Sequence, residues 1–161
     1  VNACAADVIT LIPMVTQATE NTGNAPAQVL ADAGYCSAAN LDAAADLSVT
    51  TGTQFFIATG RHRHGEPAPL APRGRIPASA TRKQKMRRKL ATKKGRAVYA
   101  RRKAIVEPVF GQMSILQDAK HLLLRGLEAA RGEWFLLATC HNFRKLHRHI
   151  GTAGLAALKT T

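Results

Sequence analysis

The sequence predicts an α/β protein in which short buried strands alternate with helices. Apolar residues recur at helical spacing at the start of the chain. Two short apolar runs, 29–32 and 54–59, stop at glycine-containing turns, as buried strands often do. Ser37 lies between the two runs and suits the N-cap of a helix. The resulting order of helix, strand, helix and strand favours a layered α/β architecture.

Size and composition agree with a single folded domain. The chain has 161 residues, of which 46% are hydrophobic and 20% charged, so it can bury a core. No run of 18 apolar residues occurs, which excludes a transmembrane helix. The three cysteines are far apart and odd in number, which argues against a disulfide scaffold and fits a reducing cytosol. Because the chain opens at Val1 without methionine, we interpret it as part of something longer.

Local signals define the first four elements. Residues 3–20 have an amphipathic helical pattern, which Pro13 would kink or split and which a glycine-containing turn ends. The strand at 29–32 is expected to end in a tight turn. The helix that Ser37 opens covers about 38–46.

The composition changes after the second strand. Residues 61–78 contain four prolines and two glycines, which predicts a loop or insertion. Positive charge dominates 79–103. Two helices are expected after it, around 98–116 and from about 127–147, and the tail from Gly151 has no strong pattern.

The basic character of the chain lies in one segment. The formal net charge is +13, and residues 61–103 hold 16 of the 23 lysines and arginines with a single acid, Glu66. The densest part comprises Arg82, Lys83, Lys85, Arg87, Arg88, Lys89, Lys93, Lys94 and Arg96. Unpaired cations at this density repel one another, and a nucleic-acid backbone relieves that repulsion with release of counterions. Tyr99 is the only aromatic residue between 61 and 109, so we expect backbone contacts rather than base stacking. A solvated helix face, a disordered arm and an anionic membrane patch are the alternatives.

Two carboxylates stand out beside this segment. Asp32 lies at the C-terminal end of the first predicted strand, where α/β proteins commonly place ligands. Glu107 is the only acid between Tyr99 and Gln117. Taken alone, Asp32 is more simply a turn residue or helix cap, and Glu107 an ion-paired surface residue. Together, beside a phosphate-binding segment, they suggest a divalent-metal site for phosphoryl transfer.

The stretches around both acids resemble the bacterial insertion-sequence transposases of the DDE type. The closest likeness is to those with a Tyr–Arg–Glu–Lys signature around the last acid. The stretches are Val-Leu-Ala-Asp-Ala-Gly-Tyr at 29–35 and Tyr-Ala-Arg-Arg-Lys-Ala-Ile-Val-Glu-Pro-Val-Phe-Gly-Gln at 99–112. The runs at 122–127 and 133–146 also look like that family. The likeness covers most of residues 1–149, with two motifs in the right order and a basic insertion between them.

This resemblance implies a ribonuclease H-like fold, a mixed sheet flanked by helices, which is incomplete in this chain. It also implies DNA transposase activity, in which three acids hold two Mg²⁺ or Mn²⁺ ions that activate water and then a DNA 3′-hydroxyl for strand cutting and joining. By position, Asp32 matches the second acid and Glu107 the third, as catalytic and metal-binding residues. Tyr99 and either Arg102 or Lys103 match signature residues that contact DNA near the cut. With the basic segment, the expected DNA contacts are Tyr99, Arg102, Lys103, Arg82, Lys83, Lys85, Arg87, Arg88 and Lys89.

The same resemblance divides the chain into four parts. Residues 1–60 would be the middle of the fold, 61–95 the basic insertion, 96–149 the last catalytic helix with the helix after it, and 150–161 a tail. The implied partners are transposon ends and target DNA, with a homodimer in the active complex and no membrane. The implied location is the bacterial cytoplasm, in association with the nucleoid.

The chain departs from the family pattern at three points. Only Asp7 and Glu20 precede the second acid, and both fall in the opening helix, so the first acid is missing. Ser114 stands where the signature lysine would fall. Pro108 disfavours a helical conformation at Glu107, which therefore begins a helix or sits at a kink. We expect this chain alone to be catalytically incomplete.

Two other hypotheses remain open. The chain could be a non-catalytic basic nucleic-acid-binding protein, ribosomal or chromatin-like, or a degraded gene product without function. Dependence on Mg²⁺ or Mn²⁺ separates the transposase from the pure binder. The histidines match no zinc pattern, so we expect them to face solvent or phosphate, although His141 falls on the apolar face of the last predicted helix.

Overall fold

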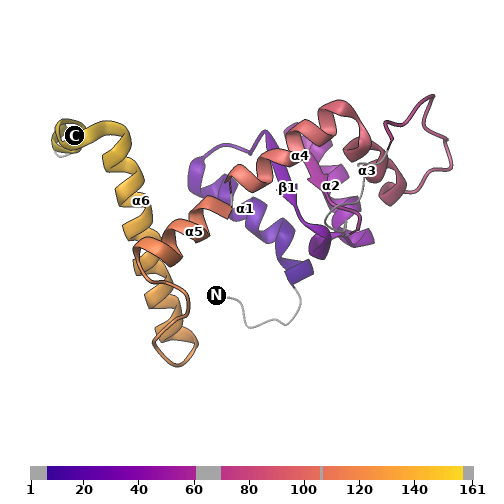
Figure 1. Ribbon diagram of the computed structural model, residues 1–161. Helices are drawn as coiled ribbons and strands as arrows, with labels where there is room; N and C mark the ends of the chain where they lie inside the picture. Colours follow the sequence, from indigo (N-terminus) through magenta and orange to yellow (C-terminus); the bar gives the residue numbers. More distant parts are fainter. Residues whose placement is uncertain (1–6, 61–69, 106, 158–161) are drawn as a thin grey trace. The chain divides into compact units, whose positions relative to one another are not determined.

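Figure 1 shows a computed structural model of the chain, which describes residues 7–60, 70–105 and 107–157. The chain divides into two compact units. Among the described residues, those up to Arg102 form the first unit and those from Lys103 onward form the second.

The first unit is a small α/β layer. Its elements in chain order are η1 (Asp7–Thr10), α1 (Leu11–Thr22), β1 (Gln28–Ala31), η2 (Ala33–Tyr35), α2 (Ala38–Thr51), β2 (Gln54–Ile57), α3 (Arg82–Ala91) and α4 (Lys93–Ile105), whose end reaches the second unit. In the described ranges the sheet consists of β1 and β2, which pair in parallel with Val29 opposite Phe55. Parallel strands need a crossover connection, and α2 lies in it. The expected order of helix, strand, helix and strand is confirmed.

The core of this unit lies between the sheet and the helices α1 and α2. Its buried members are Leu11, Ala31, Leu41, Ala44, Phe55 and Ile57. Phe56 points to the opposite face of β2 and is also only 2% exposed. Both faces of β2 are therefore covered, which explains why this parallel strand is a continuous apolar run in the sequence.

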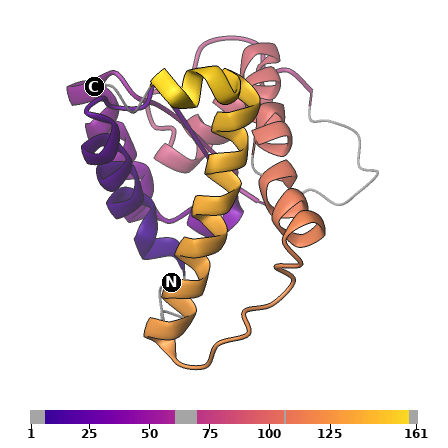
Figure 2. The same ribbon diagram turned by 90° about the vertical axis from the view of Figure 1, so that its left-hand side faces the viewer.

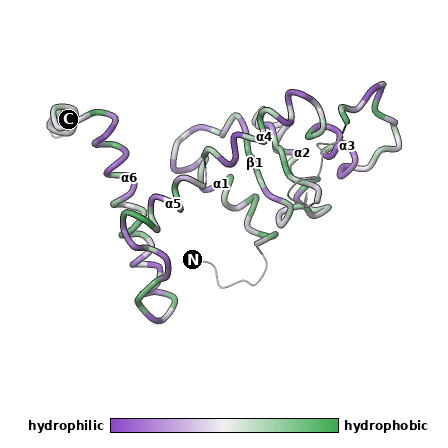
Figure 3. The backbone as a smooth tube through the Cα atoms, viewed as in Figure 1, coloured by the Kyte–Doolittle hydropathy of each residue, from purple (hydrophilic) through white to green (hydrophobic). Residues whose placement is uncertain are grey.

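Polar caps define the two basic helices. The Thr81 hydroxyl accepts a hydrogen bond from the N–H of Gln84, whose side-chain oxygen accepts one from the N–H of Thr81, and this capping box starts α3. Most of α3 is hydrophilic (Figure 3), but Met86 packs against the core. At the corner between α3 and α4, the Thr92 hydroxyl donates to the carbonyl of Lys89 and accepts from the N–H of Gly95.

The second unit contains a helix pair. α5 (Glu107–Leu116) packs against α6 (Leu127–Ala157). The rings of Phe110 and Trp134 are stacked with centroids 6.1 Å apart, and Met113 is buried. α6 changes direction at Gly151, whose φ of 66° is left-handed and suits glycine (Figures 1 and 2).

Several boundaries differ from the sequence prediction. The helix expected at about 38–46 extends to Thr51, and the strands expected at 29–32 and 54–59 are Gln28–Ala31 and Gln54–Ile57. Pro13 lies in the first turn of α1, where proline is tolerated because the N–H groups have no partner within the helix. The helix expected at 98–116 begins earlier, at Lys93, and its residues are helical on both sides of position 106, which lies outside the described residues. The tail from Gly151 continues as helix to Ala157.

Other expectations are only partly covered by the described residues. Of the loop expected at 61–78, residues 61–69 lie outside them, and 70–78 contain no helix or strand. The division at 60, 95 and 149 follows sequence character and stays a prediction. Within the described ranges, no helix combines the length and the apolar character that crossing a membrane requires.

Candidate metal and nucleic-acid site

Asp32 is the first residue after β1 and caps the turn that follows. Its Oδ1 accepts a hydrogen bond from the N–H of Gly34 at 3.0 Å, which fixes the start of η2. A short aspartate side chain favours such a turn because it reaches the backbone two residues further on. The side chain of Asp32 is 47% exposed, so a ligand in solution can reach the carboxylate.

The N-terminal end of α2 stabilises the turn that follows Asp32. Ser37 caps α2 by accepting a hydrogen bond from the N–H of Asn40. The buried Asn40 amide donates to the carbonyls of Tyr35 at 2.8 Å and Val8 at 2.6 Å. These bonds join α2 to η1 and to the turn after β1, so they fix the backbone that carries Asp32.

Arg102 of α4 reaches the same carboxylate. Its Nη2 lies 3.3 Å from Oδ2 of Asp32, and the two form an ion pair. The neighbouring Arg101 reaches Oε1 of Gln28, at the other end of β1, at 3.5 Å. Of the two candidates for the signature arginine, Arg102 contacts Asp32, whereas Lys103 is exposed.

Tyr99 lies one helical turn before Arg102, on the same face of α4. Burial raises the pKa of the Tyr99 phenol above its ordinary value. The Arg102 guanidinium lowers this pKa and the Asp32 carboxylate raises it, both by less than burial does. Near neutral pH the phenol therefore keeps its proton and offers an O–H donor beside the acid and the guanidinium.

Glu107 is the first residue of α5, with Pro108 directly after it. Residue 106 lies outside the described residues, so the expectation that Glu107 begins a helix or sits at a kink stays a prediction. The Glu107 side chain lies outside the described part of the chain. Glu107 and Asp32 belong to different units, and their joint action on metal stays a prediction.

Two arginines of α3 that were expected to contact DNA are engaged with the protein. Arg82 forms an ion pair with Asp42 at 3.2 Å. Arg88 donates to the carbonyls of Arg73 and Gly74. Both residues thereby hold α3 against α2 and against the segment before it.

Lys89 faces the sheet. Its Nζ donates to the carbonyl of Phe55 at 2.8 Å and lies 4.2 Å from the ring centroid of Phe56. Burial lowers the pKa of Lys89, and the nearby charge of Lys94 lowers it further. Lys89 is thus a contact between α3 and β2, and we leave it out of the DNA surface proposed below.

The remaining α3 cations are available to a ligand. Lys83, Lys85 and Arg87 are exposed and form no ion pair or hydrogen bond within the described part of the chain. Lys93 and Lys94, in the first turn of α4, are exposed as well. These five exposed cations remain candidates for the predicted contacts with a nucleic-acid backbone.

The Asp32 carboxylate suits a hard divalent cation. Mg²⁺ prefers oxygen ligands and is commonly held by one or two carboxylates together with substrate phosphates. An ionised carboxylate has about four lone-pair sites, and two hydrogen-bonding contacts leave room for a metal at Asp32. Across residues 7–60, 70–105 and 107–157, no three His, Cys, Asp or Glu residues gather as a metal cluster. Glu20 is engaged with Gln17 on α1.

A basic groove in the second unit was missed by sequence reasoning. It lies along α5 and α6 and includes Gln112, the buried His141 and the cations Arg144, Lys145 and Arg148. The four α6 residues are spaced i, i+3, i+4 and i+7, which places them on one helix face. This spacing could have predicted the basic side of the groove from the sequence. We expected the histidines to face solvent or phosphate. His141 does not face solvent, because it lies on the face of α6 that packs against α5.

Comparison with known proteins identifies part of the chain. Residues 74–147 match a family model described as a transposase DDE domain. No curated protein and no solved structure matches the chain. The matched residues include Tyr99, Arg102 and Glu107, and they leave out Asp32. The resemblance to DDE-type transposases is confirmed for this segment, and such a domain implies DNA as a partner.

Proposed function

We propose that this chain is a catalytic part of a DNA transposase with a ribonuclease H-like fold, in which Asp32 is the second acid and Glu107 the third. The match of residues 74–147 supports the class of function. One observation carries the role of Asp32. Arg102, from the matched segment, pairs with the Asp32 carboxylate, and Tyr99 lies close enough for that charge to act on its phenol.

In this proposal Asp32 and Glu107 hold Mg²⁺ or Mn²⁺. A bound ion would supply Lewis-acid activation of water and of a DNA 3′-hydroxyl for strand cutting and joining. The N–H of Gly34 orients the Asp32 carboxylate toward the strand end. Arg102 has further N–H groups that can bind a DNA phosphate beside it, and the protonated Tyr99 phenol can donate to a phosphate oxygen.

The proposed DNA surface adds the exposed cations of α3 and α4. Lys83, Lys85 and Arg87 are free to contact phosphates, and Lys93 and Lys94 continue the surface. Such contacts position DNA without reading its sequence. Three further parts of the proposal rest on the resemblance alone. They are the DNA contact of Lys103, the recognition of transposon ends and target DNA, and a homodimer in the active complex.

The test compares two aspartates in matched settings. Asp32 pairs with Arg102 at 3.3 Å, and Asp42 pairs with Arg82 at 3.2 Å on the exposed side of α2. We expect Asp32→Asn to weaken Mn²⁺ binding about tenfold or more, because a ligand oxygen is lost. Asp42→Asn should leave it unchanged. Electron paramagnetic resonance of free Mn²⁺, recorded with duplex DNA present, measures both.

Equal Mn²⁺ affinity of Asp32→Asn and wild type would contradict the proposal. Asp32 would then serve only to anchor Arg102 and cap the turn. The alternative, a non-catalytic basic nucleic-acid-binding protein, would be favoured, and it predicts that DNA affinity persists or rises in Asp32→Asn because repulsion of phosphate falls.

A further inference from the structure

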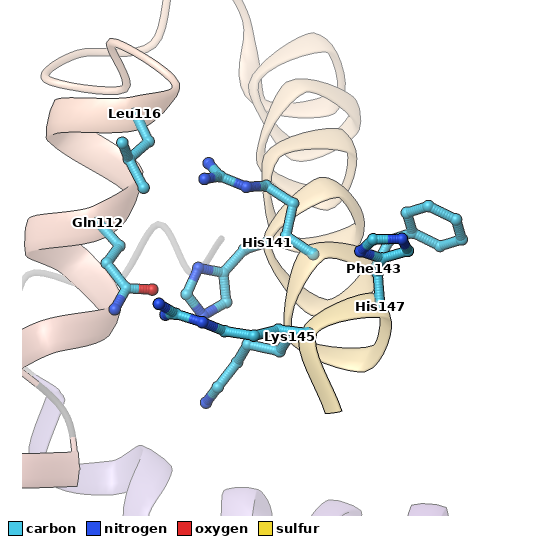
Figure 4. A pocket seen from close by; sticks show the side chains of 8 residues that line it. Gln112, Leu116, His141, Phe143, Lys145 and His147 are labelled. Atoms are coloured by element: carbon cyan, nitrogen blue, oxygen red, sulfur yellow. The ribbon is translucent and has the colours of Figure 1, made fainter. Parts of the chain in front are cut away.

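His141 combines burial with an unpartnered polar atom. The residue is 6% exposed, and its Nε2 has no hydrogen-bond partner within the described part of the chain. Buried polar atoms are nearly always hydrogen-bonded, because an unsatisfied one loses its interaction with water without replacement. Figure 4 shows the His141 ring between α5 and α6, on the side of Gln112. The ring is therefore placed to receive a partner in the groove.

The groove around this ring is cationic. Its volume along α5 and α6 is about 860 Å³, and the described residues that line it include Arg144, Lys145 and Arg148 and no acid. These three cations form no ion pair or hydrogen bond with another described residue. They follow His141 on one face of α6, the same face that is apolar at Trp134. Along α6, the face that packs against α5 is thus apolar near Trp134 and cationic from Arg144 onward.

This chemistry favours an anion with several oxygens. Three cations on one face repel one another unless a negative group lies among them. A buried ring N–H beside them can complete the coordination of such a group by a charge-assisted hydrogen bond. A metal ion is disfavoured, because a single imidazole surrounded by positive charge is a poor site for a cation.

We propose that this groove binds a backbone phosphate of DNA, with the Nε2–H of His141 donating to a phosphate oxygen and Arg144, Lys145 and Arg148 supplying the charge. The proposal rests on the proposed function in taking DNA as the ligand. It assigns a contact in the second unit that is separate from Asp32 and from the exposed cations of α3. Leu116 and Phe143 add apolar lining on which a sugar can pack.

The first test isolates the ring nitrogen. His141→Phe keeps a ring of similar size and removes Nε2, whereas His141→Gln restores an N–H at a comparable distance from the backbone. We expect His141→Phe to weaken binding of a short DNA duplex about tenfold, the usual effect of losing a hydrogen bond to a charged group, and His141→Gln to recover part of that loss. Fluorescence anisotropy with labelled duplex gives the dissociation constants, and circular dichroism checks folding.

The second test isolates the charge with a matched control. Arg144→Gln/Arg148→Gln removes two cations from exposed positions of the groove. Lys120→Gln/Arg131→Gln removes two cations of the same unit that are paired with Asp118 and Glu128 and do not line the groove. We expect the first pair to weaken binding and to reduce the slope of log K against log salt by about 1–2, and the control to change neither.

The outcomes separate this inference from the proposed function. If the groove variants bind as the control does, while Lys83→Gln/Arg87→Gln weakens binding, the groove proposal is wrong and the α3 surface stands. If the groove variants lose affinity and the α3 variant does not, the groove is supported and the α3 surface is wrong. A wild-type chain that binds no duplex would overturn both. A change in the ¹⁵N shift of His141 Nε2 on addition of DNA is the direct signature expected.

Discussion

Asp32 carries two interactions whose contributions to stability are small. A surface ion pair such as that with Arg102 is worth about 0–1 kcal/mol, and a turn-capping hydrogen bond about 1 kcal/mol. Asparagine could supply the cap equally well, since it is as good a capping residue. What asparagine cannot supply is a charged ligand for a cation. We therefore expect Asp32→Asn to leave the fold intact, so that this isosteric substitution separates the proposed ligand role from the structural one.

The pKa of the Tyr99 phenol tests whether this side chain is buried as the structure shows. The chain has two tyrosines, so Tyr35→Phe leaves Tyr99 as the only phenol. We expect ultraviolet titration of this variant to give a pKa above the ordinary phenol value, because burial disfavours the phenolate. The stability that the protonated phenol contributes is present below the ordinary value and is lost as pH rises through the folded pKa.

Further substitutions identify the neighbours that act on this phenol. Arg102→Gln should raise the Tyr99 pKa further and Asp32→Asn should lower it, since the guanidinium lowers this pKa and the carboxylate raises it. A Tyr99 pKa at or below the ordinary value, unchanged by both substitutions, would show that α4 does not bring Tyr99 to the strand end.

Some residue positions could be read from the sequence and others could not. The turn at Asp32 was predictable because Asp-Ala-Gly after an apolar run is a local signal. The contact of Lys89 with Phe55 was not, because a cation count does not say which helix face a charge occupies. Helical spacing from Met86, which packs on the core, was the available signal.

Among the elements, the corner between α3 and α4 depends on one glycine. Gly95 is buried in the first turn of α4, and a Cβ at this position would overlap the carbonyl oxygen of Lys89. The Thr92 hydroxyl fixes the same corner by bonding to both helices. The close approach determines how α4 leaves α3, and α4 carries Tyr99 and Arg102 to the strand end.

Gly95→Ala should therefore destabilise the protein by about 1–3 kcal/mol, as overpacking typically does. Gly132→Ala is the control, because Gly132 lies exposed in α6 and a Cβ there would meet no atom within 4 Å. That change should be neutral or stabilise by up to about 1 kcal/mol, since alanine is the better helix residue. Urea unfolding measures both, and equal stability of the two variants would speak against a tight corner.

Element types were easier to predict than element limits. The strands and the Ser37 cap follow from local patterns, and all three are observed. The start of α4 was not visible in the sequence, because no local pattern marks Lys93 as the first helical residue. That start depends on Thr92 and Gly95, which act through a contact with α3.

For the whole molecule, the residues that the proposal assigns fall in both units. Residues 74–147, which match the transposase domain, run from the first unit into the second. Asp32 lies in the first unit, and Glu107 and His141 lie in the second. The two acids are proposed from sequence motifs, whereas a groove formed by side chains of two packed helices is visible only once the helices are placed.

We propose that Asp32 and Glu107 belong to one divalent-metal site when DNA is present. Paramagnetic broadening by Mn²⁺ tests it most directly, with amide signals followed in both units. We expect substoichiometric Mn²⁺ to broaden the amide signals of residues 33–35 and of residues 109–111 together. Asp32→Asn should remove both effects. Broadening of one group without the other, or broadening that survives in Asp32→Asn, would contradict a shared metal site.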